Sequence, residues 1–479
     1  MTILDNRRRW LALYVLCLGD LLIVLDISIV NVALPSIRED LGFSEASLAW
    51  VINAYTLTFG GFMLLAGRLG DLFGHRRMFV LGVGFFTLAS LACGLATSQE
   101  MLVGARAIQG IGGAVVAAVA LSLIITLFTE PAERAKAMGV IGFVAAGGGS
   151  IGVLAGGVLT DLLSWQWIFL VNLPVGIAVI VFSLLLIPGT RAEAASPSLD
   201  FAGAITVTAS LMLAVYAIVN GNEQGWTSAR TLGLLGVAAV GLAFFVWRQS
   251  RIESPLMPLG LFRLRSVATS NVVGILWSAA MFAMFFLSAL YLQLVLGYSP
   301  LEVGLAFLPA NLLMGAFSLG LSAKLVMRYG VKPPLVGGMT LVATGLALFA
   351  RVPVDGSFAI DVLPSMLILG VGIGMAMNPL FLAAMSDVQP EDAGVASGVV
   401  NTSFMMGGAL GLAVLASVAA AQTGGSTTPA ALVDGYQAAF LVGTVFAVAA
   451  AVVAGVFLRG GPAPAMDPHA MGETATEVA

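Results

Sequence analysis

Residues 10–34 read WLALYVLCLGDLLIVLDISIVNVAL, an apolar run in which Asp20 and Asp26 are the only charged residues. About 20 apolar residues in a helix are enough to cross the hydrocarbon core of a bilayer. Three arginines at residues 7–9 precede the run, and its length and its internal acids are not typical of a cleaved signal peptide. We therefore expect a retained membrane-spanning helix, whose two acids at membrane depth require an explanation.

The composition of the whole chain agrees with this expectation. Of 479 residues, 59% are hydrophobic and 10% are charged, the mean hydropathy is +1.01 and the net charge is -4. A soluble domain carries about 25% charged residues, so the composition indicates an integral membrane protein rather than a nucleic-acid-binding protein. Cys17 and Cys93 lie in apolar runs, and His75 and His469 are the only histidines, so neither a disulfide framework nor a metal site is expected.

Fourteen apolar runs follow one another along the chain. They cover residues 10–34, 46–66, 78–97, 101–128, 137–160, 166–187, 200–220, 230–247, 267–292, 302–323, 334–352, 361–385, 395–421 and 436–458. The expected fold is therefore an all-α integral membrane protein in which two six-helix bundles flank two inserted helices. The expected domains are a first bundle at 1–190, the inserted helices at 191–265, a second bundle at 266–458 and a disordered cytoplasmic tail at 459–479.

The basic residues predict the orientation. If the N-terminus is cytoplasmic, all but four of the 21 Lys and Arg residues fall on the cytoplasmic side; Arg38, Arg230 and Arg351 fall outside, and Arg106 lies within a span. This bias follows the positive-inside rule. We therefore expect a multi-pass protein of the cytoplasmic (cell inner) membrane with both termini in the cytoplasm.

The chain also repeats itself. LGFS at 41–44 recurs as LGYS at 296–299, and EPAERAKAMG at 130–139 recurs as QPEDAGVASG at 389–398. The offset drifts only from 255 to 259, so the two six-span halves follow one another in the same order. Transporters built from such repeats bind their substrate between the halves and work by alternating access.

Four segments carry a resemblance to a known family. They are LDISIVNVALP at 25–35, GRLGDLFGHRR at 67–77, ARAIQGIGGA at 105–114 and SWQWIFLVNLPVG at 164–176. They resemble motifs of the major facilitator superfamily, specifically its fourteen-span drug:proton antiporter family. The resemblance implies an exporter that is involved in drug efflux and antibiotic resistance and is driven by the proton gradient, with no cofactor.

The span at 137–160 resembles the antiporter motif of that family through its glycines. They are Gly139, Gly148, Gly152, Gly156 and Gly157. Small residues on one helix face let a second helix approach closely, so we expect a tight seam that opens and closes during transport. Val153 replaces the usual proline, which weakens the case for antiport and favours the alternative of a facilitator-type importer or a symporter of a small metabolite.

The segment at 67–77 is expected to be a cytoplasmic loop that acts as a conformational latch. Its residues are Gly67, Asp71, Gly74, Arg76 and Arg77. The carboxylate would cap a helix or pair with arginine, and the glycines would allow close passage of the backbone. The alternative is that the arginines only anchor the loop at the lipid headgroups.

Asp20, Asp26 and Arg106 lie well inside predicted spans. At 1.5 Å per residue, Asp26 and Arg106 lie at depths that the long arginine side chain can bridge, with Gln109 and Asn31 as polar partners. Asp20 is roughly 240° around the helix from Asp26 and is expected to face the cavity as the protonatable group. The resemblance instead favours Asp26 as that group, so both stay candidates. A permanent Asp26–Arg106 ion pair that only joins two spans is the alternative.

The cavity between the halves is expected to bind a small amphipathic compound. Its candidate residues are Asn31, Tyr55, Gln109, Asn271, Trp277, Met281, Gln293, Asn311, Asn378, Asn401 and Phe404. Aromatic and methionine side chains adapt to loosely specified ligands, although most such residues in this chain are expected only to pack helices. No lysine follows a glycine, so a phosphate loop for ATP is not expected, and neither is an enzyme active site. The partners expected are the lipid bilayer, protons and the substrate.

Overall fold

The computed structural model describes residues 6–128, 130–188, 200–253, 255–388 and 393–459, and all regular secondary structure in these ranges is helical. Twelve helices are long and apolar enough to cross a membrane. The two other expected spans correspond to α6 (Pro131–Leu162) and to α12 (Pro300–Ala316), which continues through the π-helical turn η3 (Phe317–Leu321) into α13 (Ser322–Tyr329). The expected disordered tail lies outside the described residues from 460 onward.

The long helices form two groups and one inserted pair. The first group contains α1 (Asn6–Leu41), α3 (Trp50–Phe73), α4 (His75–Gly94), α5 (Gln99–Leu127), α6 and α8 (Asn172–Leu186), with the short α2 (Glu45–Leu48) and α7 (Trp167–Leu170) between them. The inserted pair is α9 (Phe201–Gln224) and α10 (Ala229–Gln249). The second group contains α11 (Arg265–Leu290), α12 with η3 and α13, α14 (Lys332–Phe349), α15 (Leu363–Met385), α16 (Ala393–Thr423) and α17 (Pro429–Phe457), with the turns η1 (Leu259–Arg263), η2 (Tyr291–Val295) and η4 (Phe358–Val362).

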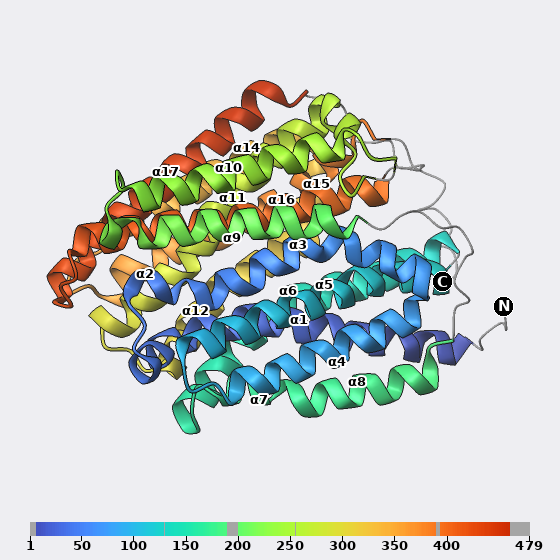
Figure 1. Ribbon diagram of the computed structural model, residues 1–479, viewed down its shortest axis with the longest axis horizontal. Helices are drawn as coiled ribbons and strands as arrows, with labels where there is room; N and C mark the ends of the chain where they lie inside the picture. The colour runs from blue at the N-terminus through green and yellow to red at the C-terminus, as the bar shows by residue number, and fades with distance from the viewer. Residues whose placement is uncertain (1–5, 129, 189–199, 254, 389–392, 460–479) are drawn as a thin grey trace.

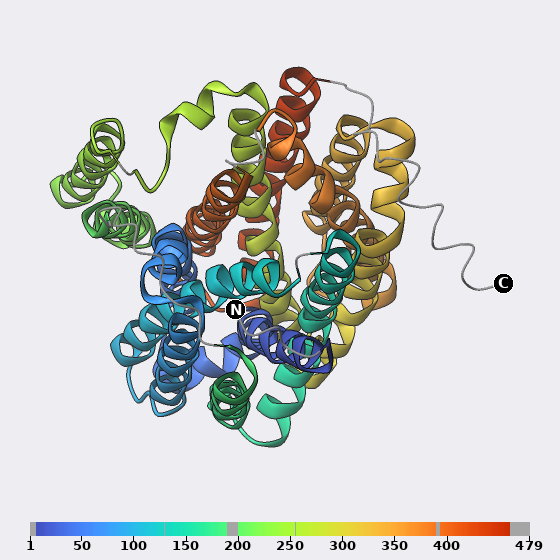
Figure 2. The same cartoon turned by 90° about the vertical axis from the view of Figure 1, so that its right-hand side faces the viewer.

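The long helices run side by side, and α1 begins at the same end of the molecule at which α17 ends (Figure 1). We call this the terminal end and the other the far end. Viewed from the terminal end, the first group and the second group lie on opposite sides, and the inserted pair stands apart beside α3 and α16 (Figure 2). The inserted helix α9 contacts both α3 and α16, so it touches both halves.

The internal repeat is visible in the backbone. Gly42 and Gly297 both have φ of 71°, a left-handed conformation that glycine adopts without strain. The serine two residues after each glycine begins the next helix, and Ser44 and Ser299 both form a capping box. Equivalent sequences therefore make equivalent turns, as the repeat predicts.

Gly148, Gly152 and Gly156 of the predicted seam form a helix contact, and the second half has an equivalent one. The surroundings of Gly139 lie outside the described part of the structure. A Cβ atom added to Gly152 of α6 would lie 2.9 Å from Cβ of Ser28 on α1, and one added to Gly156 would lie 2.7 Å from the carbonyl oxygen of Ile29. In the second half, Gly411 of α16 meets Ala279 of α11 in the same way. Gly157 faces the second half instead, because its Cβ would lie 2.6 Å from the carbonyl oxygen of Pro300 on α12. Only small residues permit these approaches.

Polar contacts hold the inserted pair. At the start of α9, the Asp200 carboxylate accepts hydrogen bonds from Arg248 Nε at 2.8 Å and Gln249 Nε2 at 2.6 Å. Burial raises the pKa of the Asp200 carboxyl, but hydrogen bonds from Arg248, Gln249 and the helix start outweigh it, so the pKa lies below its usual value. Near the far end, Asn222 Nδ2 of α9 donates to the carbonyl oxygen of Ser417 on α16 at 2.7 Å. The inserted pair is thus bonded to the second half through α16.

Candidate proton and substrate sites

Asp26 of α1 and Arg106 of α5 form an ion pair inside the first helix group. Their side chains are 0% and 1% exposed, so water does not reach either charge. The guanidinium also donates to the carbonyl oxygen of Val51 at 2.9 Å and to Gln109 Oε1 at 2.6 Å. Buried charges persist only when they are paired and hydrogen-bonded, and this pair is both.

The second carboxylate oxygen of Asp26 is also occupied. Gln109 Nε2 donates to Asp26 Oδ1 at 2.7 Å and to Ser90 Oγ at 2.8 Å. Asn172 Nδ2 lies 3.4 Å from Asp26 Oδ1. The ring of Tyr55 lies under the guanidinium of Arg106, with 4.4 Å from the ring centroid to Cζ, an attractive cation–π arrangement.

Sequence reasoning placed Asp26, Arg106 and Gln109 together, but it missed Ser90 and Asn172. Both are polar residues in otherwise apolar helices, and that was the available signal. It also named Asn31 as a partner of the pair, and this was wrong. The Asn31 amide donates to the carbonyl oxygen of Ile27 on its own helix at 3.1 Å.

Asp20 differs from Asp26 although both lie on α1. It is half-buried, and in the described part of the chain it makes no hydrogen bond and no ion pair. A carboxylate at this depth without a partner gains stability by binding a proton. Asp20 thus stays a candidate for proton uptake and release, whereas Asp26 is held by three residues, Arg106, Gln109 and Asn172.

Several predicted cavity residues are used to hold helices. Asn271 and Asn401 donate to carbonyl oxygens one turn earlier in their own helices, at 2.8 Å and 3.1 Å. Asn378 of α15 donates to the carbonyl oxygen of Ser318 in η3 at 2.6 Å, and so joins the π-helical turn to α15. Gln293 donates to the carbonyl oxygen of Val32 at 2.8 Å, which joins the two halves near the far end.

The aromatic candidates pack in the core of the second half. Trp277 of α11 and Phe404 of α16 meet edge to face with ring centroids 5.5 Å apart, and Met281 packs against the same cluster. The indole N–H of Trp277 is buried without a hydrogen-bond partner among the described residues. These residues lie together, but their role in binding stays a prediction.

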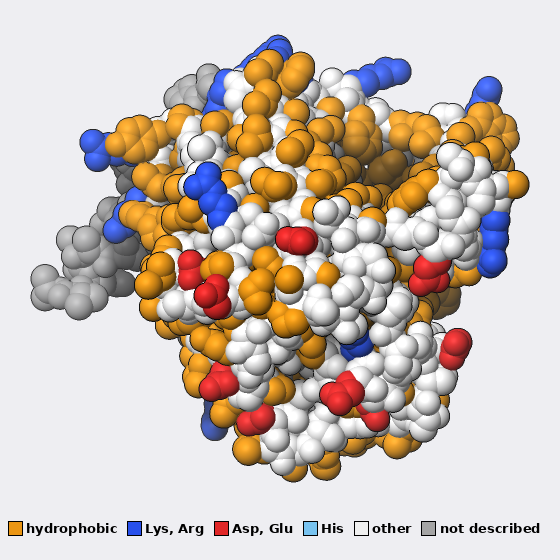
Figure 3. Space-filling model, turned by 90° about the vertical axis from the view of Figure 1, so that its left-hand side faces the viewer, with side chains coloured by type: hydrophobic (Ala, Val, Ile, Leu, Met, Phe, Trp, Pro, Cys, Tyr) orange, Lys and Arg blue, Asp and Glu red, His pale blue; other side chains and the backbone are white. Residues whose placement is uncertain are grey.

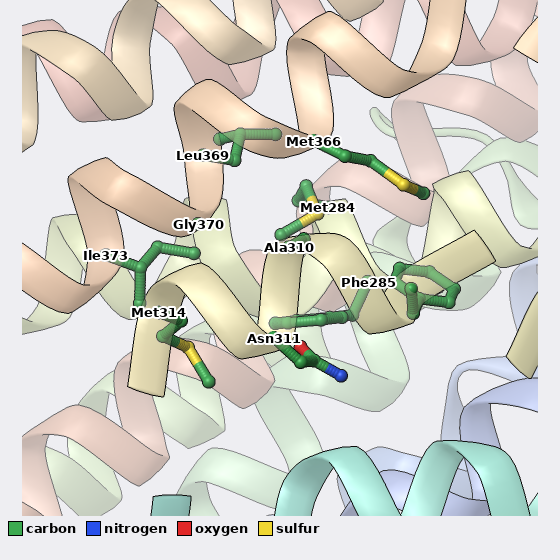
Figure 4. Close-up of a pocket in the computed structure, with 10 residues that line it drawn as sticks. Met284, Phe285, Ala310, Asn311, Met314, Met366, Leu369, Gly370 and Ile373 are labelled. Carbon is green, nitrogen blue, oxygen red and sulfur yellow. The ribbon is translucent and has the colours of Figure 1, made fainter. Parts of the chain in front are cut away.

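A small pocket lies between α11, α12 and α15 in the second half (Figure 4). Its lining residues are Met284, Phe285, Phe307, Ala310, Asn311, Met314, Met366, Leu369, Gly370 and Ile373. Of the predicted cavity residues, only Asn311 lines it. The lining contains no charged side chain, so the pocket suits an apolar group.

The predicted latch segment joins α3 to α4 at the terminal end. Gly74 has φ of 90°, which makes the turn, and Arg76 Nη2 donates to the carbonyl oxygen of Leu184 at 2.7 Å. A Cβ on Gly67 would meet nothing within 4 Å, and Arg77 is exposed. The side chain of Asp71 lies outside the described part of the structure, so the latch stays a prediction.

Potential metal ligands do not cluster in the described ranges, where no group of three His, Cys, Asp or Glu could hold an ion. Two helix groups related by a repeat, with a buried ion pair in one and an apolar pocket in the other, are the architecture of many multi-pass membrane transporters. Residues 16–412 match the Major Facilitator Superfamily model, and the chain belongs to this superfamily. The superfamily predicted from the motifs is thus confirmed.

Known proteins agree with this assignment. The chain is 41% identical to a puromycin resistance protein of Streptomyces alboniger, over 92% of this chain and 89% of the relative. It is 39% identical to a cephamycin export protein of Amycolatopsis lactamdurans, over 92% and 91%. Among solved structures, the nucleoside transporter NupG shares the fold with a TM-score of 0.65 at 14% identity, over 94% of this chain and all of that one.

Proposed function

We propose that this protein exports a small amphipathic compound, such as a drug or antibiotic, in exchange for protons. The similarity to resistance and export proteins supports the direction of transport and the class of substrate. It also favours export over the alternative of an importer or symporter, for which the replacement of a motif proline by Val153 is the main argument.

The observation that carries proton coupling is the contrast between the two acids of α1. Asp26 has polar partners on both oxygens, whereas Asp20 has none among the described residues. A proton that binds Asp20 from one side of the membrane and leaves to the other would be exchanged for substrate during alternating access. Inward proton movement supplies about 2.3 kcal/mol per charge per 100 mV, plus the pH term, to drive export.

The distribution of charged residues supports the proposed orientation in the cytoplasmic membrane. Acidic side chains are spread over the far end (Figure 3). The exposed acids of the helix ends and loops there are Glu39, Asp40, Glu100, Asp161, Glu223, Glu302, Asp355 and Asp434. Bases are sparse at this end, so by the positive-inside rule it would face outward and both termini would lie in the cytoplasm.

Transport by purified protein in liposomes tests this proposal. With puromycin as the probe and a pH-sensitive dye inside the vesicles, we expect each direction of puromycin movement to produce an opposite proton movement. The importer reading predicts puromycin flux with no proton movement, or with protons moving in the same direction. ATP has no part in the expected reaction.

A further inference from the structure

The pocket in the second half and the ion pair in the first half occupy equivalent places. In the first half, Gly110 of α5 packs against the carbonyl oxygen of Tyr55 on α3. In the second half, Gly370 of α15 packs against the carbonyl oxygen of Ala310 on α12. Because the order of the repeat is the same in both halves, these two helix crossings are equivalent. The helix that carries Arg106, α5, therefore corresponds to α15.

The equivalence can be followed residue by residue. Counting back four residues from each crossing glycine matches Met366 with Arg106, and counting back one matches Leu369 with Gln109. The helix seams give a third match. Leu25 of α1 meets Gly152 as Ala279 of α11 meets Gly411. The next residues along these helices, Asp26 and Ala280, are therefore equivalent. Arg106, Gln109 and Asp26 are therefore each replaced by an apolar residue.

This replacement leaves space instead of a polar network. Met366, Leu369 and Ala310 line the pocket, and Ala310 stands where the first half has the larger Tyr55.

 The smaller Ala310 side chain and the uncharged Met366 and Leu369 side chains thus leave an apolar recess where the first half holds a buried ion pair. Met284, Met314 and Met366 narrow this recess, and unbranched methionine side chains repack readily around a ligand.

One polar group stands at the edge of the recess. Asn311 is 4% exposed, and in the described part of the chain its amide makes no hydrogen bond. Figure 4 shows this amide projecting from α12 on the side away from Leu369 and Gly370. This amide can therefore bind a ligand that supplies a hydrogen bond.

We infer that the recess between α11, α12 and α15 is a substrate subsite that takes an apolar group when its methionine side chains repack, with the Asn311 amide hydrogen-bonded to an uncharged polar group beside it. This inference rests on the proposed export function. The lining has no acid to select a cation, so the subsite recognises shape and apolar character rather than positive charge. Proton chemistry and substrate recognition are thereby placed in different halves of the repeat.

Binding of puromycin, which carries a methoxyphenyl ring, tests the subsite in detergent-solubilised full-length protein. Ala310→Leu fills the recess, and we expect it to weaken puromycin binding about tenfold, since the ring loses its apolar burial. Asn311→Leu removes the amide and is expected to weaken binding several-fold. Ala306→Leu is the matched control, because Ala306 is also buried on α12, at 5% exposure, but does not line the recess.

The outcomes separate the subsite from the exporter. Unchanged puromycin affinity in both Ala310→Leu and Asn311→Leu, or a wild type that does not bind puromycin, would overturn the subsite. Wild-type protein that binds puromycin but moves none of it in liposomes would overturn the proposed export and leave the subsite standing. Thermal unfolding of each variant identifies any variant that fails to fold. If the Ala310→Leu variant fails to fold, the Asn311→Leu variant decides the question.

Discussion

Arg106 neutralises Asp26 inside the first helix group, where neither side chain is more than 1% exposed. The pair joins α1 to α5, and Arg106 reaches α3 as well through the carbonyl oxygen of Val51. Three spans are therefore held at one point by a charge that water cannot solvate. The cost of breaking such a pair is much larger than its net contribution to stability, because one charge is left behind.

Arg106→Leu should destabilise the protein by about 3–5 kcal/mol, because Asp26 is left buried without its counter-ion. The expected result is a lower midpoint of thermal unfolding in detergent and a poor yield. The double variant Asp26→Asn with Arg106→Leu removes both charges and should recover part of the loss. If the single variant unfolds at the wild-type temperature, the pair does not have the role described.

The glycines of α6 offer a test of the seam within one helix. Gly156→Ala should impair folding and transport, because the added Cβ would lie 2.7 Å from the carbonyl oxygen of Ile29. Gly147→Ala is the control, since a Cβ there meets nothing within 4 Å, and alanine is the better helix former by about 0.5–1 kcal/mol. Equal unfolding temperatures and transport rates for the two variants would contradict a close-packed seam.

The hydrogen bond from Gln293 to Val32 holds the two halves together near the far end. Gln293→Ala removes a bond worth about 0.5–1.5 kcal/mol, so it should shift the conformational equilibrium toward opening at the far end by roughly twofold to tenfold. Spin labels on α6 and α12 near the far end would measure the distance distribution. A distribution identical to that of the wild type would show that this bond does not favour closure.

The Asp200 cluster predicts a pH-dependent stability. The pKa of the Asp200 carboxyl is lowered in the folded protein, so its contribution is fully present above the unfolded pKa of about 3.9 and is lost as the pH falls through the lower folded value. Asp200→Asn should therefore lower the unfolding midpoint at pH 7 and have a smaller effect near pH 2. An equal loss at both pH values would mean that the charge is not what stabilises the cluster.

Much of the fold is readable from the sequence because membrane spans must be long and apolar. The depth of Asp26 and Arg106 could be counted along their helices, and so their contact was foreseeable. The partners Ser90 and Asn172 were not, because the rotation of α4 and α8 about their axes depends on packing. The contact of Asn378 was not foreseeable for a related reason: its carbonyl partner is freed by the π-helical turn η3, which the sequence does not reveal.

The central claim is that Asp20 carries the coupled proton while Asp26 is held by its partners. The most direct test is puromycin-dependent proton movement in liposomes that contain Asp20→Asn, with Asp26→Asn as the companion variant. We predict that Asp20→Asn abolishes the proton movement that accompanies puromycin transport while the protein remains folded. Full coupling in the Asp20→Asn variant, one proton signal for each puromycin signal as in the wild type, would contradict the account.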